Sequence, residues 1–266
     1  MMRSSRIIQL LAMAINVVMV ISVYFAVINE LLALAFVILL LSKWRVVATQ
    51  PRFWLRNLIN NSCDILFGAS TVSLMYYYQE QFISQSLLGA DTTRSWLVLG
   101  LAVVLLIWQL LIKPRSSDGW VAIQSAGSLS VAQLAIWTYY PQYFDSGLLL
   151  IVLSTTAAFI AGYHYARQTD EYEGRIATYM LLWSSIFAMF GWLGWLWNVQ
   201  YVLPGAFLVP QIVLSGGITG YYLATLVAIN ARSRADRRTQ FLQQSGYYGL
   251  LMLLIIFASR WGSVAG

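Results

Sequence analysis

Apolar residues occur along this chain in long blocks, and short polar or basic segments separate the blocks. A helix needs about 20 predominantly apolar residues to cross the hydrocarbon core of a bilayer. The blocks reach or approach this length, so the pattern predicts an all-α, polytopic membrane helix bundle of about nine transmembrane helices. The helices are expected at 7–26, 31–44, 58–78, 96–112, 120–140, 147–166, 176–198, 206–230 and 241–259.

The first apolar run, Ile7 to Leu41, is too long for one ordinary crossing. Asn29 and Glu30 interrupt it near its middle, so we predict a helical hairpin over 1–45 with Glu30 in the turn. No small-residue cleavage site precedes the second half of the run. We therefore expect the hairpin to remain as an anchor rather than be removed as a signal peptide. The rival layout has eight spans, with this run as one tilted or re-entrant element.

The basic residues predict the topology, because cytoplasmic segments of membrane proteins carry an excess of Lys and Arg. With the N-terminus inside, nine alternating helices place all 16 lysines and arginines on the cytoplasmic side except Arg94 and Arg260. The C-terminus is then outside, and we expect a multi-pass protein of the plasma (inner) membrane. After the hairpin, we predict an interfacial basic and aromatic segment at 46–57 and a seven-helix bundle at 58–266.

The segment from Ala206 to Asn230 is apolar enough to cross a bilayer, yet Pro210, Gly216, Gly217 and Gly220 interrupt it. In lipid, small residues let helices approach closely, and neighbouring helices satisfy freed backbone groups. One interpretation is tight helix packing through the glycines. The other is a broken helix whose exposed carbonyls face a substrate path, as in many transporters.

Polar residues inside the predicted spans define a candidate path for a small solute. The helix at 120–140 is the most polar, and Gln124 and Ser128 share one face of it. Trp192 and Trp195 lie beside glycines and could wall a pocket for a flat or sugar-like ligand, although interfacial aromatic residues give the same pattern. The hypothesised path runs between the fifth, seventh and eighth helices, and its lining residues are Gln124, Ser128, Gln133, Trp192, Trp195, Gln211, Ser215 and Thr219.

Asp64 is the acidic residue that falls clearly inside a predicted span. A carboxylate at membrane depth is costly and is usually paired or functional, so Asp64 is a candidate site for a coupling proton or cation. Alternatively, Asp64 lies a turn or two from the cytoplasmic boundary, where Arg56 or another loop arginine neutralises it. His164, at the cytoplasmic end of the sixth predicted helix, is either an interfacial residue or a titrating gate.

Composition narrows the possible functions. With 59% hydrophobic and 10% charged residues among 266, the predicted spans leave no room for a soluble catalytic domain. A single cysteine, Cys63, and a single histidine argue against an internal disulfide, a metal site or another cofactor. The motifs of zinc proteases, serine hydrolases and phosphate-binding loops are absent from the sequence. We therefore do not expect an enzyme. We expect no nucleic-acid partner either, because the net charge of +6 reflects arginines at span ends.

From Asp64 onward, the expected layout is three helices, a linking helix rich in Gln and Ser, and three more. This layout resembles the transporter and opsin superfamily, which includes SWEET-like sugar carriers, vitamin transporters of the nicotinamide-riboside type and microbial rhodopsins. Two dipeptides, Pro141-Gln142 and Pro210-Gln211, match the PQ-loop dipeptide. Similarity to heliorhodopsins lies in Trp120-Val121, Asp145, FGWLGWLWN and FLQQSGYYGLLMLLIIFASRW. A retinal Schiff base needs a lysine in the last helix, and the only lysines are Lys43 and Lys113. The resemblance therefore implies an opsin-like bundle that does not bind retinal covalently.

Two functions fit such a chain. The leading hypothesis is a small-solute membrane transporter or permease subunit. The second is a noncatalytic membrane-embedded subunit or scaffold of a larger complex, in which polar and glycine positions merely pack helices. The expected partners are membrane lipids together with a small-molecule solute, protein partner chains or further copies of this chain.

Overall fold

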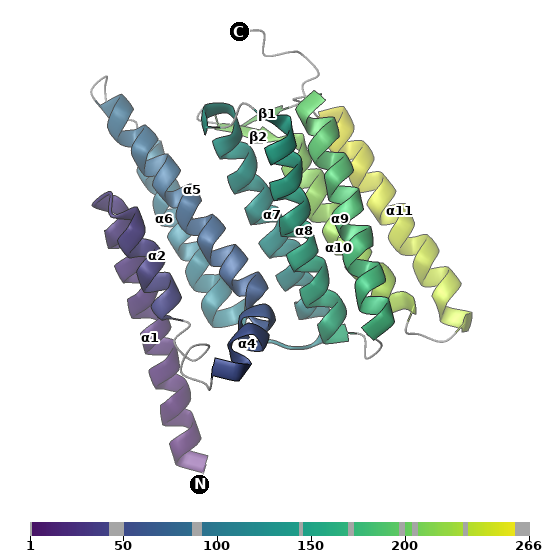
Figure 1. Cartoon of the computed structure of the whole chain (residues 1–266), viewed down its shortest axis with the longest axis horizontal. Coiled ribbons are helices and arrows are strands. Elements are labelled where there is room, and N and C mark those ends of the chain that lie inside the picture. The colour runs from purple at the N-terminus through teal and green to yellow at the C-terminus, as the bar shows by residue number, and fades with distance from the viewer. Residues whose placement is uncertain are drawn as a thin grey trace. The chain divides into compact units, whose positions relative to one another are not determined.

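The computed structural model of this protein describes residues 2–42, 51–86, 92–143, 146–169, 173–196, 200–203, 207–230 and 234–258. These residues are helical apart from one short two-stranded hairpin, so the predicted all-α class is confirmed (Figure 1). A helix lies within every segment for which the apolar pattern predicts one. The chain forms two compact units, Met1–Arg115 and Ser116–Gly266. The division between them falls inside the segment 58–266, which the sequence pattern suggests is one bundle.

Unit 1 contains an N-terminal helical hairpin and a second pair of helices. Its elements are α1 (Met2–Ile28), α2 (Leu32–Leu41), the 3-10 turn η1 (Pro51–Phe53), α4 (Trp54–Asn60), α5 (Ser62–Ser86), α6 (Thr92–Ile107) and the π-helical turn η2 (Trp108–Ile112). Helix α1 packs against α2, α5 and α6, and α5 packs against α2 and α6. Of the predicted interfacial segment 46–57, residues 46–50 lie outside the described residues. Arg52, Phe53 and Trp54 are exposed, and the Arg52 guanidinium lies over the Phe53 ring.

The turn between α1 and α2 falls where the sequence predicts it. The backbone N–H of Leu31 donates to the carbonyl of Ala26 at 2.9 Å, and that of Glu30 donates to Val27 at 3.0 Å. These two bonds form a Schellman motif, which satisfies carbonyls at the end of α1. Glu30 occupies the left-handed position of the motif, with a φ of 61°.

Unit 2 is a ring of four helices with a fifth at its edge. Its elements are α7 (Asp118–Tyr143), α8 (Gly147–Thr169), α9 (Glu173–Leu196), β1 (Gln200–Leu203), β2 (Phe207–Pro210), α10 (Gln211–Asn230) and α11 (Arg234–Ala258). Each of α7, α8 and α9 packs against the next helix, and α10 closes the ring by packing against both α9 and α7. Helix α11 packs against α10 (Figure 1). The four helices of the ring therefore enclose a common interior.

The prediction of one interrupted helix from Ala206 to Asn230 is wrong at its N-terminal end. Phe207–Pro210 forms strand β2, which pairs antiparallel with β1. The residue before a proline is biased towards extended backbone, and proline cannot supply an interior helical N–H. Pro210 therefore ends the strand, and an unbroken helix follows from Gln211 through the three glycines.

Most of the other helices also extend beyond their predicted ends, as three of them illustrate. Helix α5 continues through Gln79 and Glu80 to Ser86, α7 includes Pro141 in its last turn, and α11 begins at Arg234 instead of near Phe241. The predicted ends followed hydrophobicity, but glutamine, glutamate and arginine are good helix formers. A change from apolar to polar residues along the chain therefore does not mark the end of a helix, because the helix continues into the polar segment.

Two helices among the described residues are long and apolar enough to cross a membrane, judged by length and composition alone. They are Gly147–Gln168 within α8 and Ile176–Leu196 within α9. The described residues also include shorter apolar helices at Met13–Ile28, Leu32–Leu41 and Trp96–Ile112. Both candidate spans therefore lie in unit 2, and the shorter apolar helices lie in unit 1.

Candidate functional site

The most concentrated polar site of unit 1 forms around Asp64, which the sequence singles out as a candidate ion site. Asp64 lies in the first turn of α5, and Lys113 caps the end of η2. A carboxylate is stabilised at a helix N-terminus and an ammonium at a helix C-terminus, because each opposes the partial charge of the backbone there. The packing of α5 against α6 brings these two ends together.

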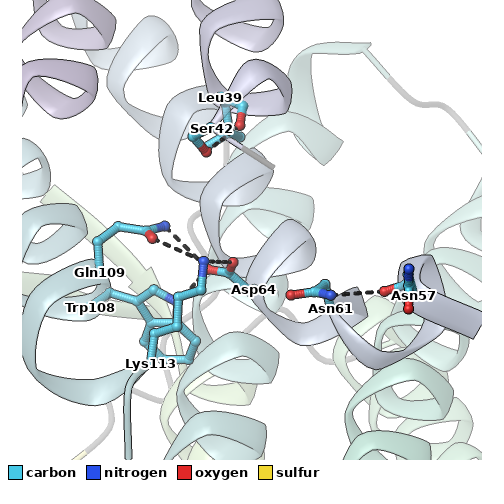
Figure 2. Close-up of polar contacts among 8 residues, drawn as sticks. All are labelled: Leu39, Ser42, Asn57, Asn61, Asp64, Trp108, Gln109 and Lys113. Atoms are coloured by element: carbon cyan, nitrogen blue, oxygen red, sulfur yellow. Dashed lines mark hydrogen bonds and ion pairs between the residues drawn. The ribbon is translucent and has the colours of Figure 1, made fainter. Parts of the chain in front are cut away.

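Three side chains converge on the Asp64 carboxylate, as Figure 2 shows. Trp108 Nε1 and Gln109 Nε2 donate to Asp64 Oδ1 at 3.0 and 3.1 Å. Lys113 Nζ lies 2.6 Å from Asp64 Oδ2 and also donates to Gln109 Oε1 at 3.4 Å. The two carboxylate oxygens therefore have different partners, since neutral donors hold Oδ1 and the ammonium holds Oδ2.

The π-helical turn places these groups on one side of α6. The backbone N–H of Lys113 donates to the carbonyl of Trp108, five residues earlier, at 2.9 Å. The wider turn lets two consecutive residues, Trp108 and Gln109, both reach Asp64, and π-turns of this kind occur frequently at functional sites. The Trp108 ring stacks on Phe67 with centroids 3.7 Å apart, which fixes the orientation of the indole N–H donor.

The interior of unit 2 holds a second group of polar side chains, centred on Gln133 of α7. Gln133 Nε2 donates to the backbone carbonyl of Ser154 on α8 at 3.2 Å. Gln133 Oε1, Ser154 Oγ and Trp137 Nε1 are buried and have no hydrogen-bond partner in the protein. Trp137 lies one helical turn beyond Gln133 and packs against Leu150, which lies one turn before Ser154. These three orphan groups thus lie along one stretch of the α7–α8 contact.

Other residues of the hypothesised path form hydrogen bonds within or between helices. Gln124 Oε1 lies 3.3 Å from His164 Nε2, so these buried side chains link α7 to α8. Ser128 Oγ donates to the carbonyl of Ser125 within α7. Thr219 Oγ1 lies 3.1 Å from the hydroxyl of Tyr248 on α11. The His164 side chain is 9% exposed, so it is buried between the helices of unit 2.

The remaining path residues do not join the polar group in the interior. Trp192 and Trp195 are 51% and 46% exposed, and Trp195 packs closely over Gly147. Ser215 is buried on α10, and the Gln211 side chain lies outside the described residues. Of the eight residues, Gln133 is the one that presents an unpartnered buried polar atom in the described structure.

The glycines of α10 permit close contact with two neighbouring helices. A methyl group at Gly216 would lie 2.9 Å from Phe187 Cε1, and one at Gly220 would lie 3.2 Å from Leu129 Cδ2. A methyl group at Gly217 would meet the Ser130 side chain. These contacts agree with tight packing through the glycines, and α10 has no break at Gly216, Gly217 or Gly220.

Several residues of these two sites are not identified as site residues by the sequence analysis. The sequence pattern marks Lys113 only as one of the basic residues on the cytoplasmic side, and the side chain of Arg56, the suggested counter-charge, lies outside the described residues. Asp64 begins one helix of an antiparallel pair and Lys113 ends the other, so their proximity could have been inferred. Trp137 and Ser154 offer no comparable signal, because isolated tryptophan and serine residues are common in apolar helices.

Comparisons with protein-family models, with curated proteins and with solved structures find no match. The functional interpretation therefore depends on the geometry of the two sites.

Proposed function

We propose that this chain is a multi-pass membrane protein that transports a small uncharged polar solute through the interior of unit 2. Support for the membrane location comes from large apolar side chains on helix exteriors, such as Leu148, Met189 and Phe257. Only 39% and 22% of the residues are buried in the apolar windows of α8 and α9. The core helix of a soluble protein would bury most of such a window, whereas a helix in lipid leaves it exposed.

The observation that carries the transport proposal is the pair of orphan oxygens on Gln133 and Ser154. A buried polar group without a partner costs roughly 1–3 kcal/mol, so each such group in a folded protein requires an explanation. A solute that donates hydrogen bonds to these oxygens removes that cost when it binds. The indole N–H of Trp137 supplies a donor one helical turn away.

The charge of the surroundings narrows the class of solute. Among the described residues of α7 to α10, the buried polar side chains belong to Gln, Ser, Thr and His, with no Asp, Glu, Lys or Arg. An ionised solute would lose its hydration there without gaining a fixed counter-charge. A neutral polyol, sugar or amide fits this interior better than an ion.

Substitutions at the orphan oxygens test this proposal. A thermal-shift screen of neutral polyols, monosaccharides and amides on the purified protein selects a solute, whose radiolabelled form is then followed into proteoliposomes. Gln133→Leu and Ser154→Ala each remove one hydrogen-bonding oxygen, and we expect each to lower the rate of uptake about tenfold. Ser184→Ala is the matched control, because Ser184 is buried but donates to Met180 within its own helix. Unchanged uptake in the Gln133 and Ser154 variants would exclude this route.

A second candidate function is a noncatalytic membrane subunit, and the glycine contacts of α10 favour it. Gly216 and Gly220 bring α10 into close contact with α9 and α7. Interfaces rich in small residues are a common means of packing membrane helices without any transport role. Purification in mild detergent followed by native mass spectrometry distinguishes the two functions. A stable complex with a different chain would favour the subunit, and a co-purified neutral small molecule would favour the transporter.

A further inference from the structure

We propose that Asp64 Oδ2 and Gln109 Oε1 form a binding site for a monovalent cation, which the Lys113 ammonium occupies in this structure and leaves when the cation binds. The proposal depends only on contacts within unit 1, and it does not require unit 2 to transport a solute. Its starting point is the position of Lys113 Nζ. This atom lies 2.6 Å from a carboxylate oxygen and 3.4 Å from an amide oxygen.

The two oxygens are the kind of ligand that alkali cations prefer. Carboxylate and amide carbonyl oxygens are hard donors that bind hard cations, whereas softer metals favour sulfur or imidazole ligands. In Figure 2 the Lys113 ammonium lies between the carboxylate of Asp64 and the amide of Gln109. The ammonium therefore marks a point at which two oxygens of different side chains already converge on one positive charge.

The carboxylate is held in place by groups other than Lys113. Trp108 Nε1 and Gln109 Nε2 both donate to Oδ1, and the Trp108 ring is fixed by stacking on Phe67. The same Gln109 amide that donates to Oδ1 directs its oxygen towards the ammonium. When Lys113 leaves, Oδ2 and Oε1 consequently keep their orientation, so the site is organised before the cation arrives.

Lys113 has a route out of the site, because its side chain is 33% exposed whereas that of Asp64 is 9% exposed. Lysine has a long flexible stem, and its ammonium is readily hydrated at a helix end. Exchange of the ammonium for a monovalent cation leaves the charge beside Asp64 unchanged. A divalent ion would leave an excess positive charge, and the described residues contain no group of three His, Cys, Asp or Glu side chains suited to one.

The experiment measures binding of ²²Na⁺, and of ⁸⁶Rb⁺ as a substitute for K⁺, to the full-length protein in detergent by scintillation proximity. Lys113→Met keeps most of the apolar stem and removes the competing ammonium. We expect it to lower the Kd for at least one of the two cations tenfold or more relative to the wild type. Asp64→Asn in the Lys113→Met background removes the charged ligand, and we expect it to abolish this binding. Arg52→Met is the matched control, since it removes an exposed cation of the same unit that lies over the Phe53 ring, and it should leave the Kd unchanged.

Two outcomes would overturn the cation site. One is a Lys113→Met variant that binds neither cation more tightly than the wild type does. The other is a double variant that binds as tightly as Lys113→Met alone. If Lys113→Met folds poorly, its yield of folded protein is compared in sodium, potassium and choline chloride at equal ionic strength. Rescue by sodium or potassium but not choline supports the site, and equal yields refute it. Gln133→Leu should bind cations as the wild type does, which separates this result from failure of the transport proposal.

Discussion

At the scale of single residues, Glu30 is the residue with the clearest backbone cost. Its φ of 61° lies in the left-handed region, which costs a residue with a Cβ about 1–2 kcal/mol relative to glycine. The Schellman bonds of Glu30 and Leu31 hold the turn in this conformation. We therefore predict that Glu30→Gly raises the free energy of unfolding by about 1 kcal/mol, measured as an upward shift of the thermal midpoint in detergent.

The control for this prediction is Glu30→Ala. Alanine removes the carboxylate but keeps the Cβ, so it should give no comparable gain in stability. If Glu30→Ala stabilises as much as Glu30→Gly, then charge and not backbone conformation determines the cost at this position.

Individual residues also show what the sequence could and could not predict. The position of Glu30 in a turn followed from two polar residues inside a long apolar run. The importance of Asp64 followed from the cost of a carboxylate among apolar residues. Its contacts with Trp108 and Gln109 did not follow, because they depend on a π-helical turn whose i, i+5 spacing leaves no mark in the apolar pattern.

At the scale of secondary-structure elements, the glycines of α10 and those of α11 have opposite environments. A methyl group at Gly216 would lie 2.9 Å from the buried ring of Phe187, whereas one at Gly249 would have nothing within 4 Å. Overpacking a tightly packed interior costs about 1–3 kcal/mol, while glycine in an open helical position costs about 1 kcal/mol relative to alanine. The same substitution should consequently have opposite effects in the two helices.

We predict that Gly216→Ala lowers the free energy of unfolding by about 1–3 kcal/mol and that Gly249→Ala raises it by up to about 1 kcal/mol. Thermal unfolding of both variants in the same detergent provides the measurement. A stable Gly216→Ala variant would mean that Phe187 moves aside easily and that the contact between α9 and α10 is looser than the distance indicates.

The elements themselves were easier to predict than their ends. Long apolar blocks locate the helices because a helix among apolar neighbours needs an apolar surface over most of its length. The strand Phe207–Pro210 was missed because its residues are as apolar as those of the helix that follows. Pairing with Gln200–Leu203 decides between strand and helix, and such a tertiary contact cannot be read from local composition.

At the scale of the whole molecule, the surface of the helices is the main physical feature. Large apolar side chains are exposed on α1, α2, α6, α8, α9 and α11. The polar groups of Gln133 and Ser154 are buried, and so is the carboxylate of Asp64. A water-soluble protein would instead carry polar and charged side chains over most of these helix faces. The interior is mostly apolar as well, so the apolar exterior is the reason for proposing that lipid surrounds the helices.

The topology follows from the same proposal and can be tested with two engineered cysteines. The distribution of Lys and Arg predicts that the turn at Glu30 is outside the cell and that Ser116, which follows α6, is on the cytoplasmic side. Both side chains are exposed, and the native Cys63 is buried and can be replaced by alanine. In this background, Glu30→Cys should react with a membrane-impermeant maleimide in intact cells, whereas Ser116→Cys should react only after the membrane is permeabilised.

Each of two contrary results has a distinct cause. If the first apolar run is a single re-entrant element, Glu30→Cys stays protected because the turn then lies within the bilayer. If the chain does not cross the membrane, both cysteines stay unlabelled in intact cells and both react after lysis.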